Sequence, residues 1–392
     1  MLPPFIMTSE PGSFAESTIR RRKPQIVATV LATNAYPPEV VAALQSLAAE
    51  IAAGPVAPLA VWPPDQPWWR DAWAPLEGRN WFDLPWYFAE AYFYRRLLAA
   101  VRYDELGPLH HRDPFLPQKR AALPAAIASL ESVVDLLSPE LATAAALRLW
   151  LRRSLWGNRA DLSNQTVAID RHHYAGEDDR ERLLIDDTAV IDAHLVAGRV
   201  RRLDLVADNS GPELCADLVL LDYLLRASLV GQVRLHLKSL PFFVSDAMIA
   251  DVSETIAAMH GSLCVPIHEL AARLEGWLAS GQLVLQAHGA WASPLLFDAL
   301  PADLLADLAA ADLVLFKGDA NYRRMLADRH WPPTRALDAI SAFMPTSFVL
   351  LRTLKSELVV GLAAGEAETL SALDPDWLIN GERGVIQLVW RS

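Results

Sequence analysis

Three oxygen-bearing side chains stand out because each follows a short β-type run of the chain. Asp208 and Asn209 come directly after Val200–Ala207, and Asp246 follows Gln232–Lys238 and a connecting loop. Carboxylate and amide oxygens are hard ligands that suit Mg²⁺ or Mn²⁺ and leave coordination positions open for other oxygens. We therefore interpret Asp208, Asn209 and Asp246 as a candidate metal-binding set, with Asp208 and Asp246 as the candidate catalytic carboxylates.

Positive side chains follow later apolar runs in the same way. Lys317 and Arg323 come after one run, and Arg352 and Lys355 come after the next. Cations of this kind bind phosphate oxygens, and a metal with cations stabilises charge on a transferring phosphoryl group. The set therefore favours a phosphoryl-transfer site, and His288, which follows another run, is a candidate to line the same cleft.

Each acidic candidate also has a structural interpretation. Asp208 and Asn209 fit the start of a turn, and Asp246 fits a helix N-cap. Ser210 and Glu213 match the S-x-x-E capping box of a following helix, whereas a cleft at this place would make Glu213 a substrate-binding residue. The functional interpretation depends on all these residues meeting at one place.

The elements that would bring them together lie mainly in the second half of the chain. From about residue 200, short β-type runs alternate with helical segments, which indicates a mostly parallel sheet covered by helices on both faces. In such sheets ligands bind outside the carboxyl ends of the strands, where the polar clusters stand. The expected strands are Val200–Ala207, Gln232–Lys238, Gln282–Ala287, Asp312–Phe316, Ser347–Leu351 and Val385–Trp390, and the expected helices are Pro212–Ser228, Ser253–Met259, Val265–Ser280 and Pro301–Ala310.

The first half has a different pattern. Residues from about 36 to 190 show helical periodicity without strand alternation, as in Pro38–Ala52 and Trp86–Val101. The stretch from Trp62 to Trp86 holds six tryptophans, which indicates a helix-packing core or, alternatively, a wall of a ligand cleft. We therefore expect a mainly helical region over 1–190 and an α/β domain over 191–392 that carries the metal site.

Composition excludes several classes of protein. A net charge of −12 over 392 residues argues against a nucleic-acid partner. Two cysteines argue against a disulfide framework and predict a cytoplasmic protein, and the sequence predicts no membrane span. The chain has no G-x-G turn and no G-x-x-x-x-G-K loop, which disfavours dinucleotide-binding and P-loop enzymes.

Six segments spread from about residue 81 to 355 resemble the damage-control phosphatase family, formerly a domain-of-unknown-function group. The last is the R-T-x-K signature of the acidic-residue methyltransferase 1-like branch. The segments are Trp81–Trp86 with Glu90 and Tyr94–Arg96, Leu155–Ser163, Asp208–Glu213, Phe243–Asp246, Phe316–Arg323 and Arg352–Lys355.

This resemblance implies a helical N-terminal region packed on a Rossmann-like, three-layer αβα domain. It implies a divalent metal (Mn²⁺, Mg²⁺, Co²⁺ or Ni²⁺) at the three oxygen ligands named above, and hydrolysis of fructose 1-phosphate and, more weakly, fructose 6-phosphate in metabolite damage control. The attacking group is either a metal-bound water or the Asp208 carboxylate, and the sequence does not choose between them. The implied substrate contacts are Asp208, Asn209, Asp319, Asn321, Arg323 and Lys355.

One family name suggests an alternative, an S-adenosylmethionine-dependent protein-glutamate O-methyltransferase. Such a site in an α/β fold usually has a Gly-rich turn after the first strand, and Asp208–Gly211 occupies that position here. The expected partner is therefore a small phosphorylated metabolite, and the sequence does not give the oligomeric state.

Overall fold

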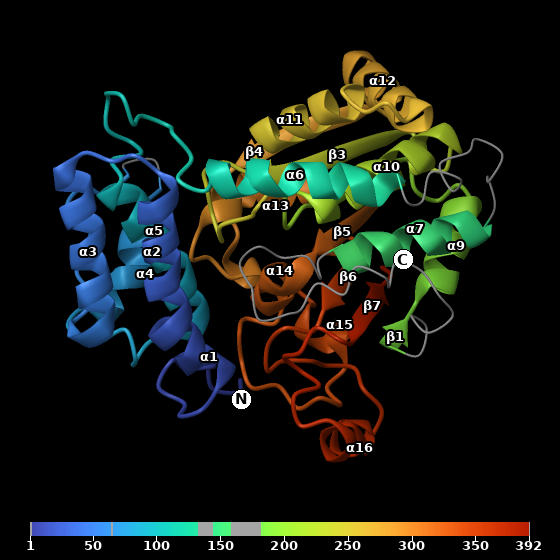
Figure 1. Cartoon of the computed structure of the whole chain (residues 1–392). Coiled ribbons are helices and arrows are strands. Elements are labelled where there is room, and N and C mark those ends of the chain that lie inside the picture. The colour runs from blue at the N-terminus through green and yellow to red at the C-terminus, as the bar shows by residue number, and fades with distance from the viewer. Residues whose placement is uncertain (1, 64–65, 132–143, 158–181, 392) are drawn as a thin grey trace.

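One seven-stranded sheet organises the chain in the computed structural model, which describes residues 2–63, 66–131, 144–157 and 182–391 (Figure 1). The strand order is β1-β7-β6-β5-β2-β3-β4, and every neighbouring pair is parallel except β6 and β7. The mostly parallel α/β fold is confirmed. The strands are β1 (Leu183–Asp186), β2 (Arg202–Val206), β3 (Gln232–Lys238), β4 (Leu283–His288), β5 (Leu313–Lys317), β6 (Phe348–Thr353) and β7 (Gly384–Val389).

The sheet is buried on both faces, which makes three layers. Along β5, Leu313 and Leu315 join one apolar cluster whereas Val314 and Phe316 join the other, because successive side chains point to opposite faces. The first cluster is covered by α6 (Leu116–Glu131), α7 (Ala144–Trp156), α9 (Thr188–Val196), α10 (Pro212–Arg226), α11 (Ile249–His260) and α12 (Val265–Ser280). The second takes in α13 (Ala302–Ala309), α14 (Gly318–Met325), α15 (Leu337–Ile340) and α16 (Glu366–Leu373).

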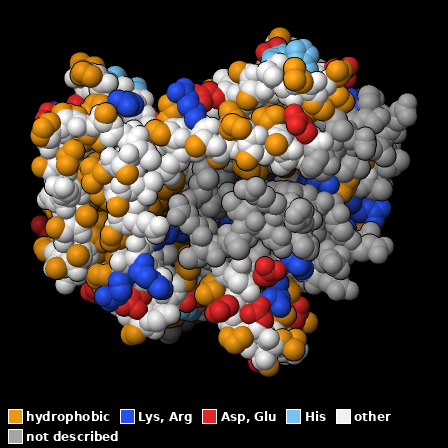
Figure 2. Space-filling view, viewed as in Figure 1, with side chains coloured by type: hydrophobic (Ala, Val, Ile, Leu, Met, Phe, Trp, Pro, Cys, Tyr) orange, Lys and Arg blue, Asp and Glu red, His pale blue; other side chains and the backbone are white. Residues whose placement is uncertain are grey.

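The N-terminal helices form a block that belongs to the second cluster and stands beside the sheet in Figure 1. They are α1 (Phe14–Ser17), a π-helical turn (Thr18–Arg22), α2 (Lys23–Thr33), α3 (Pro38–Ala53), α4 (Trp68–Trp73) and α5 (Trp86–Ala100). In Figure 2, charged and apolar side chains are interspersed over these helices.

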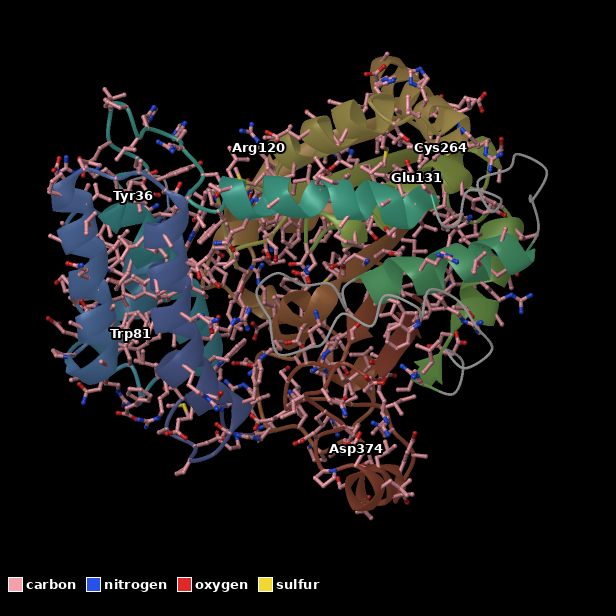
Figure 3. The ribbon with its side chains drawn as sticks, in the orientation of Figure 1. Tyr36, Trp81, Arg120, Glu131, Cys264 and Asp374 are labelled. Carbon is pink, nitrogen blue, oxygen red and sulfur yellow. The ribbon has the colours of Figure 1, made fainter. Side chains whose placement is uncertain are left out.

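The tryptophan-rich segment builds the core of this block. Trp69 and Trp81 are fully buried, and each ring lies 6.3 Å from the ring of Tyr92 on α5. Trp81 lies inside the block in Figure 3, and its Nε1 donates to Glu50 on α3. These contacts support the helix-packing interpretation, although Trp86, at the start of α5, contacts Arg323 of α14.

The six expected strands all form, with ends within two residues of those expected. The expectation that residues 36–190 contain no strand is wrong, because β1 joins the edge of the sheet beside β7. Four residues, Leu-Leu-Ile-Asp, are too few for alternation to reveal a strand. Helices α6 and α7 also pack against α10, which covers the sheet. The domain boundary expected near residue 190 therefore stays a prediction.

The order of the strands creates one topological switch point. The chain runs from β2 outward to β3 and β4, then returns to the other side of β2 for β5 and β6. In such sheets the crevice beyond the carboxyl ends of the two central strands is the usual ligand site. Within the described residues, no helix is long and apolar enough to cross a membrane.

Candidate functional site

Asp208 lies at this switch point, two residues beyond the end of β2. Its carboxylate faces the first residue of α14, Gly318, which follows β5. Gly318 has φ +84°, and a Cβ atom built on it would lie only 1.9 Å from Asp208 Oδ2. Only glycine therefore fits here, and the Asp208 carboxylate is held against the backbone of the neighbouring strand end.

Asp246 is brought to Asp208 by the loop that follows β3. Phe243 and Val244 both have positive φ, 44° and 68°, which is strained for these side chains. The loop then pairs with the end of β2: Ala247 N donates to Asp208 O at 2.8 Å, and Asn209 and Asp246 form an isolated bridge. The three predicted metal ligands are therefore neighbours, and all three are buried.

The Asn209 amide has a defined orientation. Its Nδ2 donates to Asp208 Oδ2 and to Glu213 Oε2, both at 2.9 Å, whereas its Oδ1 accepts from Ser245 Oγ at 2.6 Å. A carbonyl oxygen has two lone pairs, so Oδ1 keeps one for a further partner. Two carboxylates and an amide oxygen on the loops after β2 and β3 form a donor set that fits a hard divalent cation.

Glu213 lies beneath this group in a buried set of charges. Lys317 Nζ lies 3.0 Å from Glu213 Oε1 and 2.8 Å from Asp217 Oδ1, and it also donates to Ser154 O at 2.5 Å. Burial raises the pKa of Asp217 to about 6, against the lowering effect of Lys317. Burial alone would lower the pKa of Lys317, but Asp217 and Glu213 outweigh it and raise it.

This arrangement changes two expectations. The ammonium of Lys317 is enclosed by two carboxylates and a carbonyl, which argues against its predicted direct contact with a substrate. The alternative capping box is not formed either, because the N-cap of α10 is Gly211 and has no side-chain cap. Glu213 instead binds Asn209 and Lys317, so it orients a predicted metal ligand.

Helix α14 carries the other predicted substrate contacts. Asn321 is buried and its Nδ2 donates to Lys317 O at 2.8 Å, and Asp319 forms an ion pair with Arg352 at 2.7 Å. Arg352 is thereby engaged on β6, and it also donates to Ser356. Lys355 is buried just beyond the end of β6.

Arg323 connects α14 with the N-terminal block. Its guanidinium carbon lies 3.6 Å from the ring centroid of Trp86, and its Nε donates to Asp328 at 2.6 Å. Asp328 also accepts from the backbone N of Tyr87 at 2.9 Å, at the first turn of α5. Burial raises the pKa of Tyr87, and the charges of Asp246 and Asp208 both act on it. The start of α5 therefore lies next to α14 and to the loop that carries Asp246.

Two buried lysines at the site were missed. Lys238, the last residue of β3, lies 3.1 Å from Asp246 Oδ2, and Lys119 of α6 donates to Asp246 O at 2.9 Å. Lys119 also pairs with Asp251, which completes the capping box of α11 through Met248. Asp246 is therefore not the N-cap of that helix. A lysine inside an otherwise buried β-run is the sequence feature that could have identified Lys238.

His288 has a local role. Its Nδ1 accepts from Ala290 N at 3.0 Å, and its Nε2 lies 3.4 Å from Asp303. These contacts fix the turn after β4 and give no support to a position in the cleft. The Asn158–Ser163 part of the family resemblance lies outside the described residues.

A second candidate cluster combines Asp204 of β2, His236 of β3 and Asp307 of α13. Ligand atoms of Asp204, His236 and Asp307 come within 4.8 Å of one another, a spacing that could hold a metal ion. However, Arg202 Nη2 lies 2.7 Å from Asp204 and 3.0 Å from Asp307, and Arg234 lies 2.5 Å from Asp307. Because two guanidinium groups already neutralise these carboxylates, we interpret the group as an ion-pair cluster and favour the Asp208 site for metal.

Comparison with known proteins gives a consistent result. The model of the damage-control phosphatase ARMT1-like domain matches residues 18–370. The chain is 33% identical to mouse damage-control phosphatase ARMT1 over 98% of both proteins, and 32% identical to the human protein over 79% of this chain and 76% of that one. A solved DUF89-family structure from Pyrococcus horikoshii superposes with a TM-score of 0.51 at 13% identity, covering 95% of this chain and 96% of that one.

Proposed function

Because the chain belongs to the ARMT1-like damage-control phosphatase family, we propose that it removes phosphate from a small phosphorylated metabolite with the help of a divalent metal. Asp208, Asn209 and Asp246 would hold the metal, which supplies positive charge next to the phosphoryl group. The family relation favours this activity over the methyltransferase alternative.

One structural observation carries the proposal: Asp208, Asn209 and Asp246 meet, buried, at the switch point of the sheet, and buried polar atoms without partners lie on the same loop and on α14, which begins beside Asp208. Among the described residues, Ser210 Oγ, Asn321 Oδ1 and both terminal nitrogens of Arg323 have no hydrogen-bond partner. A buried polar atom without a partner costs about 1–3 kcal/mol, so such atoms are rare unless a ligand satisfies them. A phosphorylated polyol offers acceptors for Arg323 and hydroxyl groups for Asn321 and Ser210.

The residues divide the work as follows. Arg323 binds phosphoryl oxygens, while Asn321 and Ser210 orient the remainder of the substrate. Lys317 and Glu213 hold Asn209 in place, and Asp319 is fixed by Arg352. Asp208 either attacks phosphorus itself or positions the attacking water, and Asp246 is the second carboxylate that can handle a proton.

We propose ketose phosphates, fructose 1-phosphate before fructose 6-phosphate, as the substrates. A panel of sugar and nucleotide phosphates with Mg²⁺, Mn²⁺, Co²⁺ or Ni²⁺ should show metal-dependent release of phosphate, highest for the ketose phosphates. No hydrolysis with any of these metals would refute the proposed function, whereas a different preferred ester would refute only the substrate.

Asp208→Ala tests the site itself. This variant should lose at least about a thousandfold in kcat, because it removes both a predicted metal ligand and the candidate nucleophile. Its circular dichroism and unfolding midpoint should stay close to those of the wild type. If most of the activity remained at saturating metal, the assignment of Asp208 would be wrong.

A further inference from the structure

Lys238 is a buried cation that contacts the side-chain carboxylate of a predicted metal ligand. Its Nζ lies 3.1 Å from Asp246 Oδ2 and donates to Trp291 O at 3.2 Å, and the Lys238 and Asp246 side chains are 2% and 1% exposed. The backbone imposes this pairing: Lys238 N donates to Ala247 O at 2.9 Å, and Ala247 N donates to Asp208 O at 2.8 Å.

The ammonium has capacity for one more oxygen. Within the described part of the chain its oxygen partners are Asp246 and Trp291, and an ammonium has three N–H donors. A buried lysine–carboxylate pair rarely stabilises a fold more than apolar residues of the same size would. Its position at the carboxyl end of β3, beside β2, therefore points to function.

Building on the proposed function, we propose that Lys238 is an active-site cation that competes with the divalent metal for Asp246 and binds a phosphoryl oxygen of the substrate through its remaining N–H. In the metal-free protein the ammonium neutralises Asp246. When a divalent cation shares that carboxylate, the attraction between Lys238 and Asp246 weakens and more of the lysine's charge acts on the phosphoryl group. Lys317, enclosed by Glu213 and Asp217, does not serve this purpose.

The test separates the two halves of this role by using Lys238→Met. Mn²⁺ binding is measured without substrate at pH 8, by electron paramagnetic resonance of the free ion. Removing a positive charge next to a ligand should tighten Mn²⁺ binding by about tenfold. Binding of inorganic phosphate, measured as competitive inhibition at saturating Mn²⁺, should weaken by about tenfold or more because a charged donor is lost. Lys238→Arg, which keeps the charge, should recover part of the phosphate affinity.

Lys119→Met is the matched control. Lys119 is also a buried lysine at the same loop, but it bonds Asp246 through the backbone carbonyl and pairs with Asp113 and Asp251. Its loss should loosen the loop and weaken Mn²⁺ binding or leave it unchanged.

The outcomes are distinguishable. Tighter Mn²⁺ with weaker phosphate in Lys238→Met alone supports the inference. Weaker or unchanged Mn²⁺ binding in that variant, or unchanged phosphate inhibition, overturns it and leaves Lys238 as a structural residue. A wild-type protein that neither binds Mn²⁺ nor hydrolyses phosphate esters would refute the proposed function itself.

Discussion

Gly318→Ala should impair catalysis beyond what its loss of stability accounts for. A Cβ atom at this position would lie 1.9 Å from Oδ2, 2.2 Å from Cγ and 2.8 Å from Cβ of Asp208. Rotation of the carboxylate does not relieve all three contacts, so the whole Asp208 side chain must move by about 1 Å. Misplacement of a reacting group by that amount costs about a hundredfold in rate, which corresponds to about 2.7 kcal/mol. The left-handed backbone adds about 1–2 kcal/mol of strain to the folded state.

Gly281→Ala is the control that isolates the backbone strain. Gly281 ends α12 with φ +74°, close to the +84° of Gly318, and a Cβ there would meet nothing within 4 Å. Gly281→Ala should lose about 1–2 kcal/mol in urea unfolding and keep its activity, whereas Gly318→Ala should lose at least as much stability and also lose activity. The assay is steady-state phosphate release at saturating metal, together with urea unfolding of each variant. Equal activity in the two variants would contradict the placement of the Asp208 carboxylate against α14.

Two further predictions follow from contacts at the edge of the site. Trp86→Leu removes the ring stacked on Arg323, a contact worth about 1–2 kcal/mol. KM should therefore rise several-fold with a smaller change in kcat, and Trp86→Phe should recover most of the lost affinity. A change in thermal stability alone would show that the ring does not position Arg323. Burial raises the pKa of Asp217 to about 6, above its ordinary value of 3.8, so its contribution to stability is present below pH 4 and is lost as pH rises through about 6. Urea unfolding between pH 4 and 7 should therefore show a smaller fall in stability for Asp217→Asn than for the wild type, and equal pH profiles would contradict this reasoning.

The strands and the oxygen ligands could be predicted from sequence because both depend on local patterns. Segments of five to seven residues with a β-type pattern mark β2 to β7, and polar residues after β2, β3 and β5 mark the carboxyl edge of the sheet. Asp208, Asn209 and Asp246 do meet there, since parallel strands place their ends on one side.

Side-chain contacts between residues far apart in the sequence cannot be predicted from such local patterns. Lys317 ends β5, one residue beyond the expected strand, but its side chain turns into the core towards Ser154 and Asp217 rather than towards the crevice. The stacking of Arg323 on Trp86 joins residues more than 200 positions apart, and no periodicity encodes it. The sequence marks Lys238 only as the end of a strand, whereas its burial next to Asp246 depends on how the following loop folds back.

The edge strand β1 has a consequence for how the chain is made. Its partner in the sheet is β7, and Leu183 pairs with Gly384. At about 5–20 residues per second, a ribosome needs roughly 10–40 s to synthesise the chain between these strands. Throughout that time β2 to β5 can assemble in order, whereas β1 has an unpaired edge that invites association with other chains. Completion of the sheet is therefore a late event, and a nascent chain arrested before residue 384 should bind chaperones that recognise exposed strands.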